Sequence, residues 1–166
     1  MTQDVSEGVV RIKKEFTEKY QGNAHLHEAI PLETSDILPI SENDLKHLHD
    51  FAKSNPIYEN SFEMSICDIR CLVYEGDINN YWLDSIKHDT SYAPFYPTWI
   101  LSAHSLAIQA SSMGIENAID IGSGDGRIAY CCKAVGIKSY GIEIDENLVE
   151  LQKSIANKTG INFDAI

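Results

Sequence analysis

From Thr98 onward, short apolar runs alternate with segments whose apolar residues recur at helical spacing. This alternation predicts helices over 98–114, 125–135 and 146–158, and strands over 117–121, 138–144 and from 161. Strands that alternate with helices of this length are typical of βαβ units in a parallel sheet. Because such crossovers are right-handed, we expect the loop 122–126 at the carboxyl edge of the sheet, where ligands bind.

Residues 1–90 carry a different pattern, in which apolar residues recur mainly at helical spacing. Helices are predicted over 4–20, after a cap at Ser41, and over 77–87. The segment 61–75 fits either a helix or a strand. The sequence therefore predicts a mostly helical accessory region over 1–90 and an α/β region over 91–166.

The charge balance disfavours some classes of partner. With 13 basic and 25 acidic residues among 166, the net charge is −12. The acidic residues are spread along the chain and no basic stripe is visible, so nucleic acid is not expected as a partner. No apolar run approaches the length of a membrane span, and the polar N-terminus is not typical of a signal peptide. A cytoplasmic location without a membrane partner is therefore expected.

The cysteines and histidines do not predict a metal site. Cys67 and Cys71 are four residues apart and Cys131 and Cys132 are adjacent, so neither pair has the C-x-x-C spacing of zinc or redox sites. Buried, reduced thiols are expected. The sequence HLH occurs twice, but residues two apart on a helix point in different directions.

The segment AIDIGSGDGRIAY (118–130) places three alternate glycines, Gly122, Gly124 and Gly126, between a predicted strand and a predicted helix. A dinucleotide-binding fingerprint would need its third glycine at position 127, which holds Arg127. The Gly-Lys-Ser/Thr sequence of a phosphate-binding P-loop is also absent. Arg127 is expected to be a solvated residue in the first turn of the helix.

Acidic residues around this loop indicate which ligand suits it. Asp120 and Asp125 would repel a pyrophosphate. Glu143 follows Gly122 by 21 residues and ends the next predicted strand, where a carboxylate accepts hydrogen bonds from ribose hydroxyls. A cationic nucleoside without phosphates meets these requirements. The alternative is a tight strand-to-helix connection with a nearby surface charge.

The segments DIGSGDGR (120–127) and YGIEID (140–145) resemble the first two motifs of class I S-adenosylmethionine-dependent methyltransferases. Pro97–Thr98, with Thr98 22 residues before Asp120, is similar to a Pro-Thr pair in archaeal protein-lysine methyltransferases and their Dot1-like relatives. The resemblance covers residues 93–166. It implies a Rossmann-like α/β fold, S-adenosyl-L-methionine as cofactor, and protein lysine as the favoured methyl acceptor, with small molecules and RNA left open.

The resemblance also implies roles for single residues. Asp120 would bind the methionine ammonium, and Glu143 would hold the ribose. Tyr96, Thr98 or Phe95 would close over the cofactor. The residues implied in cofactor binding are Asp120, Gly122, Ser123, Gly124, Gly126, Glu143, Tyr96 and Thr98.

The class I fold ordinarily has seven strands, whereas this chain ends as a third predicted strand begins. The segments that usually contact adenine and supply catalytic residues would follow, so no catalytic residue is predicted. We expect a truncated chain, or a partner chain or second copy that completes the open sheet. Two alternatives to a methyltransferase are a non-catalytic nucleoside-binding regulatory module and an NAD-dependent enzyme.

Overall fold

The computed structural model describes residues 4–77 and 96–166. The first range contains α1 (Val5–Lys19), β1 (Leu26–Pro31), α2 (Glu42–Ser54), β2 (Tyr58–Ile66) and β3 (Ile69–Gly76). The second contains α4 (Ile100–Ser112), β4 (Asn117–Ile121), α5 (Arg127–Ala134), β5 (Lys138–Ile142), α6 (Glu146–Thr159) and β6 (Asp164–Ala165). The predicted helix over 77–87 and the predicted boundary at 90/91 lie outside the described residues, apart from Asp77.

The two predicted helices of the first range are confirmed, and each begins at a side-chain cap. Asp4 accepts a hydrogen bond from the Ser6 amide at the start of α1, and Ser41 accepts one from the Asp44 amide at the start of α2. Such caps satisfy amides that have no partner within the helix. None of the helices in the described ranges has the length and apolar character needed to cross a lipid bilayer.

The first range also contains an antiparallel sheet, which corrects the prediction of a mostly helical region. Its strand order is β1-β3-β2. The ambiguous segment 61–75 is a hairpin, whose turn residues Cys67 and Asp68 have φ angles of 53° and 59°. Positive φ at both central residues is typical of the tight turns that match the twist of paired strands.

The residues of β2 alternate between apolar and polar, which indicates a strand, although apolar residues at helical spacing also made a helix a possible prediction. Phe62, Met64 and Ile66 alternate with more polar residues, and the exposure along β2 alternates over this stretch. A period of two is the strand repeat. The helical spacing of Ile66 and Ile69 spans the hairpin turn, so the two residues lie on different strands.

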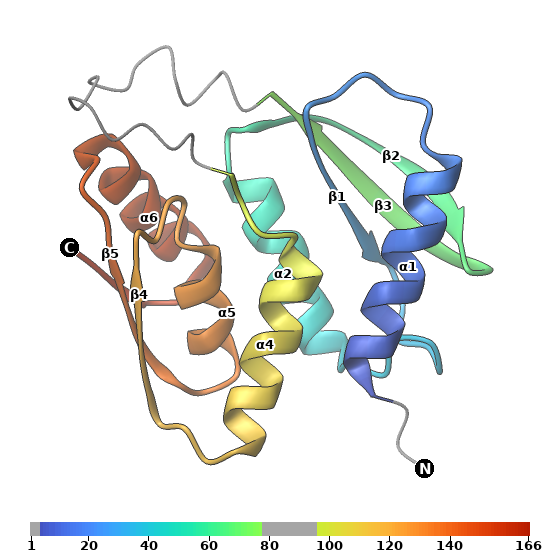
Figure 1. Cartoon of the computed structure of the whole chain (residues 1–166). Helices are drawn as coiled ribbons and strands as arrows, with labels where there is room; N and C mark the ends of the chain where they lie inside the picture. The colour runs from blue at the N-terminus through green and yellow to red at the C-terminus, as the bar shows by residue number, and fades with distance from the viewer. Residues whose placement is uncertain (1–3, 78–95) are drawn as a thin grey trace.

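The second range has the predicted alternation of strands and helices. β4, β5 and β6 pair in parallel in that order, so the prediction of βαβ units is confirmed for these residues. Right-handed crossovers in a sheet that grows in one direction place successive helices on the same face. Figure 1 shows α5 and α6 together on one side of β4 and β5.

The other face of the parallel sheet is apolar and exposed. Ile121 is 82% exposed. The large hydrophobic side chains exposed on or next to this sheet are Ile119, Ile121, Ile142, Ile144 and Ile166. None of the described elements covers these side chains. Completion of the sheet by a partner chain or a second copy stays a prediction.

The two sheets share one hydrophobic core. In Figure 1, α2 and α4 lie between the antiparallel and the parallel sheet. The rings of Phe51 in α2 and Tyr130 in α5 are 5.0 Å apart between centroids, and the Tyr130 hydroxyl donates to the His47 carbonyl at 2.6 Å. Buried side chains from both ranges form a single cluster. The antiparallel sheet is therefore packed into the same body as the glycine loop.

The cysteines are free thiols, as predicted, with Cys67 half-buried and the other three buried. Burial raises the pKa of the Cys71 thiol to about 12. These thiols are therefore protonated at neutral pH and poor nucleophiles. Within residues 4–77 and 96–166, no group of three His, Cys, Asp or Glu side chains is arranged to bind a metal ion.

His104 is a buried base between α4 and α2. It is 1% exposed, and neither of its ring nitrogens has a hydrogen-bond partner among the described residues. Its Nε2 lies 3.6 Å from Oδ2 of Asp44. Burial is the main cause that lowers the pKa of His104; the charge of Asp44 opposes this effect, and His47 adds to it. The folded protein therefore favours neutral His104.

We predict that acid destabilises the protein in part through His104. Between its lowered folded pKa and the unfolded value of about 6.5, the unfolded state binds more protons, so stability falls as the pH drops below about 6.5. The His104→Leu variant should lose less unfolding free energy between pH 7 and pH 5 than the wild type, measured by urea denaturation. Between pH 7 and pH 8 the two proteins should change in parallel. An equal loss of stability on acidification would contradict the assignment.

Candidate functional site

The glycine loop, residues 122–126, joins β4 to α5 at the carboxyl end of the parallel sheet. Gly122, Gly124 and Gly126 all have left-handed backbone conformations, with φ angles of 77°, 58° and 82°. L residues with a side chain rarely adopt this conformation, which explains the choice of glycine at the three alternate positions. The open side of the loop is at Gly122, where an added Cβ would meet no atom of residues 4–77 or 96–166 within 4 Å.

Gln152 supports the loop from the buried side. Its Nε2 donates to the Gly124 carbonyl at 2.8 Å and to Ser123 Oγ at 2.9 Å. An added Cβ at Gly126 would lie 2.7 Å from Gln152 Cγ. The Ser123 side chain therefore points into the interior, where its hydroxyl is hydrogen-bonded to Gln152. Only the backbone of Ser123 is left for the role predicted from the sequence.

Gln152 was not among the residues predicted for the site, although the sequence contains a signal for it. It lies four residues after Leu148 and three before Ile155, so it shares their buried face of α6. A polar side chain at such a position needs hydrogen-bond partners inside the protein. The loop supplies these partners.

Glu143 lies across from the loop, just beyond the end of β5. Its Oε2 accepts a hydrogen bond from the Gly124 amide at 2.7 Å, and its Oε1 accepts one from the Asp145 amide at 3.1 Å. The residue is half-buried. Each carboxylate oxygen has a second lone pair, so Glu143 retains acceptor capacity toward a ligand.

The amides of the loop are largely occupied within the protein. Gly122 and Ser123 both donate to the Ile142 carbonyl, and Gly126 donates to the Ser123 carbonyl. With Gly124 donating to Glu143, none of these four amides lacks an acceptor. A phosphate-binding loop presents free amides to its ligand. This arrangement therefore does not favour a phosphate group.

Asp120 contributes a second carboxylate next to the loop. It is half-buried, and burial, followed by the charges of Asp125 and Glu143, raises its pKa. The carboxylate is thus in a region where further negative charge is unfavourable. A bound cation would stabilise its ionised form.

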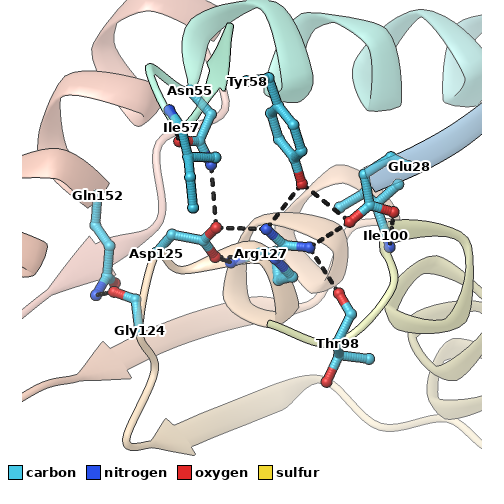
Figure 2. Close-up of polar contacts among 10 residues, drawn as sticks. All are labelled: Glu28, Asn55, Ile57, Tyr58, Thr98, Ile100, Gly124, Asp125, Arg127 and Gln152. Atoms are coloured by element: carbon cyan, nitrogen blue, oxygen red, sulfur yellow. Dashed lines mark hydrogen bonds and ion pairs between the residues drawn. The ribbon is translucent and has the colours of Figure 1, made fainter. Parts of the chain in front are cut away.

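Arg127 lies in the interior, which corrects the prediction of a solvated residue. It is 2% exposed. Its Nε and Nη2 donate to the two carboxylate oxygens of Asp125 at 3.0 and 2.6 Å, and its Nη1 donates to Glu28 Oε1 at 2.6 Å (Figure 2). Burial alone would lower the pKa of Arg127, but the charge of Asp125 and further acidic neighbours hold it well above its usual range.

Neutral groups complete the hydrogen bonding of this buried cluster. The Asn55 amide donates to Asp125 Oδ2 at 3.0 Å, and the Tyr58 hydroxyl donates to Glu28 Oε1 at 2.9 Å. The backbone amide of Ile100 donates to Glu28 Oε2 at 2.8 Å. Burial raises the pKa of Glu28, and the charge of Arg127 is the main opposing cause. Each carboxylate oxygen of Glu28 accepts at least one hydrogen bond.

Glu28, Asn55 and Tyr58 were not predicted as part of the site, because the sequence places them far from the loop. Their contacts to residues 125–127 span between 69 and 99 positions of the chain. A signal existed only for Glu28, which is an acidic residue directly before the apolar stretch AIPL (29–32). No spacing rule connects it with Arg127.

Two of the three residues predicted to close over the cofactor, Tyr96 and Thr98, lie just before α4. Tyr96 is 76% exposed. Thr98 is also exposed, and its carbonyl accepts a hydrogen bond from Arg127 Nη1 at 2.7 Å. The backbone at Thr98 is thus linked to the loop through Arg127, while the closing role of both side chains stays a prediction. Phe95 lies outside the described residues.

No protein family and no curated protein matches this sequence. Among solved structures, the chain is similar to TehB from Haemophilus influenzae, with 16% sequence identity and a TM-score of 0.34. The match covers 60% of this chain and 31% of TehB. This chain therefore spans less than a third of that structure, and a similarity of this size carries no functional inference.

We predict that Arg127→Met lowers the free energy of unfolding by about 3–5 kcal/mol, because it leaves two buried carboxylates without their cation. Arg70→Met is the matched control, since Arg70 pairs with Glu63 at 3.0 Å and both side chains are more than half exposed. Loss of such a surface pair costs about 0–1 kcal/mol. Urea denaturation at pH 7 measures both changes. A loss from Arg127→Met no larger than that from Arg70→Met would contradict the structural role of Arg127.

Proposed function

We propose that the chain binds S-adenosyl-L-methionine at the glycine loop and belongs to a methyltransferase. The observation that carries the proposal is the position of Glu143, whose half-buried carboxylate accepts a hydrogen bond from the Gly124 amide of the loop. A carboxylate at the end of the second strand of a βαβ unit is the usual partner of ribose hydroxyls. The resemblance of the loop to the first methyltransferase motif supports the same ligand.

The charges of the site favour a cation over a phosphate. Asp120 and Glu143 are both half-buried next to the loop, and four of the five loop amides, those of Gly122, Ser123, Gly124 and Gly126, already have acceptors. S-adenosylmethionine carries a sulfonium and an ammonium and has no phosphate. In this proposal Asp120 binds the ammonium and Glu143 the ribose hydroxyls. The ligand then lies against Gly122, where no side chain in the described part of the chain fills the space.

The reaction requires positioning more than chemical activation by the protein. If bound, S-adenosylmethionine would supply an electrophilic methyl group to a neutral amine nitrogen of the acceptor; the carbon–sulfur bond would break to leave S-adenosylhomocysteine, and the methylated amine would release a proton to water. The chain contributes by holding the ligand and excluding water. Tyr96 and Thr98 are the proposed closing residues. We propose a protein lysine as acceptor, in keeping with the resemblance and with a net charge of −12, which attracts basic chains.

We predict that S-adenosylhomocysteine, the demethylated product, binds to the wild type in isothermal titration calorimetry. Gly122→Ala should weaken this binding by at least about tenfold, which corresponds to 1.4 kcal/mol, because the added methyl group enters the space assigned to the ligand. The variant should also lose about 1–2 kcal/mol of unfolding free energy, which is the cost of placing one L residue with a side chain in a left-handed conformation.

Gly114→Ala is the matched control for this variant. Gly114 has the same φ angle of 77°, and its added Cβ also meets no atom of the described residues within 4 Å, but it lies at the end of α4. The control should lose similar stability and retain full affinity. Equal affinity of both variants, or stabilisation of the protein by NAD and not by S-adenosylhomocysteine, would contradict the proposed ligand.

A further inference from the structure

Glu28 is an acidic residue in an unusual place. It lies in β1 and is 1% exposed. Burial of a carboxylate is costly unless the charge is paired and its oxygens accept hydrogen bonds. Glu28 meets this condition through Arg127, Tyr58 and the Ile100 amide. The proposed function assigns no role to this residue.

One side of the Glu28 carboxylate is connected to the glycine loop. Arg127 binds Glu28 through Nη1 and Asp125 through Nε and Nη2. The planar guanidinium fixes the position of both carboxylates relative to each other. Asp125 lies between Gly124 and Gly126, so its position constrains the backbone of the loop. Figure 2 shows this chain of contacts from Glu28 to the loop.

The other side of the same carboxylate is connected to the start of α4. Glu28 Oε2 accepts from the Ile100 amide at 2.8 Å, and Ile100 is the first residue of α4. An amide in the first turn of a helix has no partner within the helix, so this bond fixes where α4 begins. The residues just before it, Tyr96 and Thr98, are the proposed closing residues. Glu28 therefore connects both walls of the proposed site.

We propose that Glu28 is a positioning residue, through which the antiparallel sheet sets the shape of the glycine loop and the start of α4. The shape of the ligand site then depends on residues of both sheets and not on the parallel sheet alone. The effect of Glu28 on ligand affinity rests on the proposed function. Its effect on the loop itself does not.

The test is Glu28→Gln, which keeps the shape of the side chain. An amide has one acceptor oxygen and one donor nitrogen, so either the Ile100 amide or the pair of Arg127 and Tyr58 would face a donor. The backbone amide resonances of Gly122, Gly124 and Gly126 report on the loop in the protein without ligand. They should shift clearly in Glu28→Gln, while that of Gly160, at the far end of α6, stays in place. The affinity for S-adenosylhomocysteine should fall by about tenfold at a temperature where the variant is fully folded.

Val73→Ala is the control variant, which should lower the stability of the protein without changing the position of the glycine loop. Val73 is fully buried in β3 and is paired with Ala29 in β1, next to Glu28 in the same sheet. This variant should be less stable than the wild type but should leave the loop resonances and the affinity unchanged. Glu28→Asp retains the charge and should give smaller shifts than Glu28→Gln. If Glu28→Gln does not fold, the loop resonances of Glu28→Asp are compared with those of Val73→Ala. The proposal then requires shifts in Glu28→Asp and none in Val73→Ala.

Unchanged loop resonances in Glu28→Gln, or equal shifts in Val73→Ala, would overturn the proposal. Shifted resonances in a protein whose wild type does not bind S-adenosylhomocysteine would support the positioning role and contradict the proposed ligand. The two proposals can therefore fail separately.

Discussion

The buried guanidinium of Arg127 is the interaction on which the arrangement of the two sheets around the loop depends. It lies between Asp125 of the loop and Glu28 of the antiparallel sheet. Two buried carboxyl groups share one guanidinium in the interior, an arrangement that is stable only with a complete set of hydrogen bonds. Tyr58, Asn55 and the Ile100 amide supply these bonds. Because the cluster draws on four separate segments, it forms only when both sheets are in place.

The loop itself combines two properties that belong together. Four of its five amides donate within the protein and its surroundings are acidic, so it differs from loops that bind phosphates. At the same time no side chain of the described residues fills the space at Gly122, and the Glu143 carboxylate lies against the Gly124 amide. These properties favour a positively charged nucleoside. Gln152 and Arg127 hold the loop in this shape from the buried side.

Local patterns were enough to predict the parallel sheet and its loop, but not the antiparallel sheet or the buried cluster. The alternation of strands and helices after Thr98 is a local signal, and three alternate glycines mark a sharp turn. The hairpin of β2 and β3 was ambiguous because apolar residues on both sides of its turn mimic helical spacing. The sequence predicts Arg127 as a surface residue, because its partner Glu28 lies 99 positions away in the chain. Long-range ion pairs have no sequence period.

A double-mutant cycle between Glu28→Gln and Asp125→Asn tests most directly whether one network joins the antiparallel sheet to the loop. The two carboxylates are coupled through Arg127. The unfolding free energies of the wild type, both single variants and the double variant give the coupling. We predict that the change in unfolding free energy of the double variant differs from the sum of the two single changes by more than about 1 kcal/mol. Additivity within about 0.5 kcal/mol would contradict it.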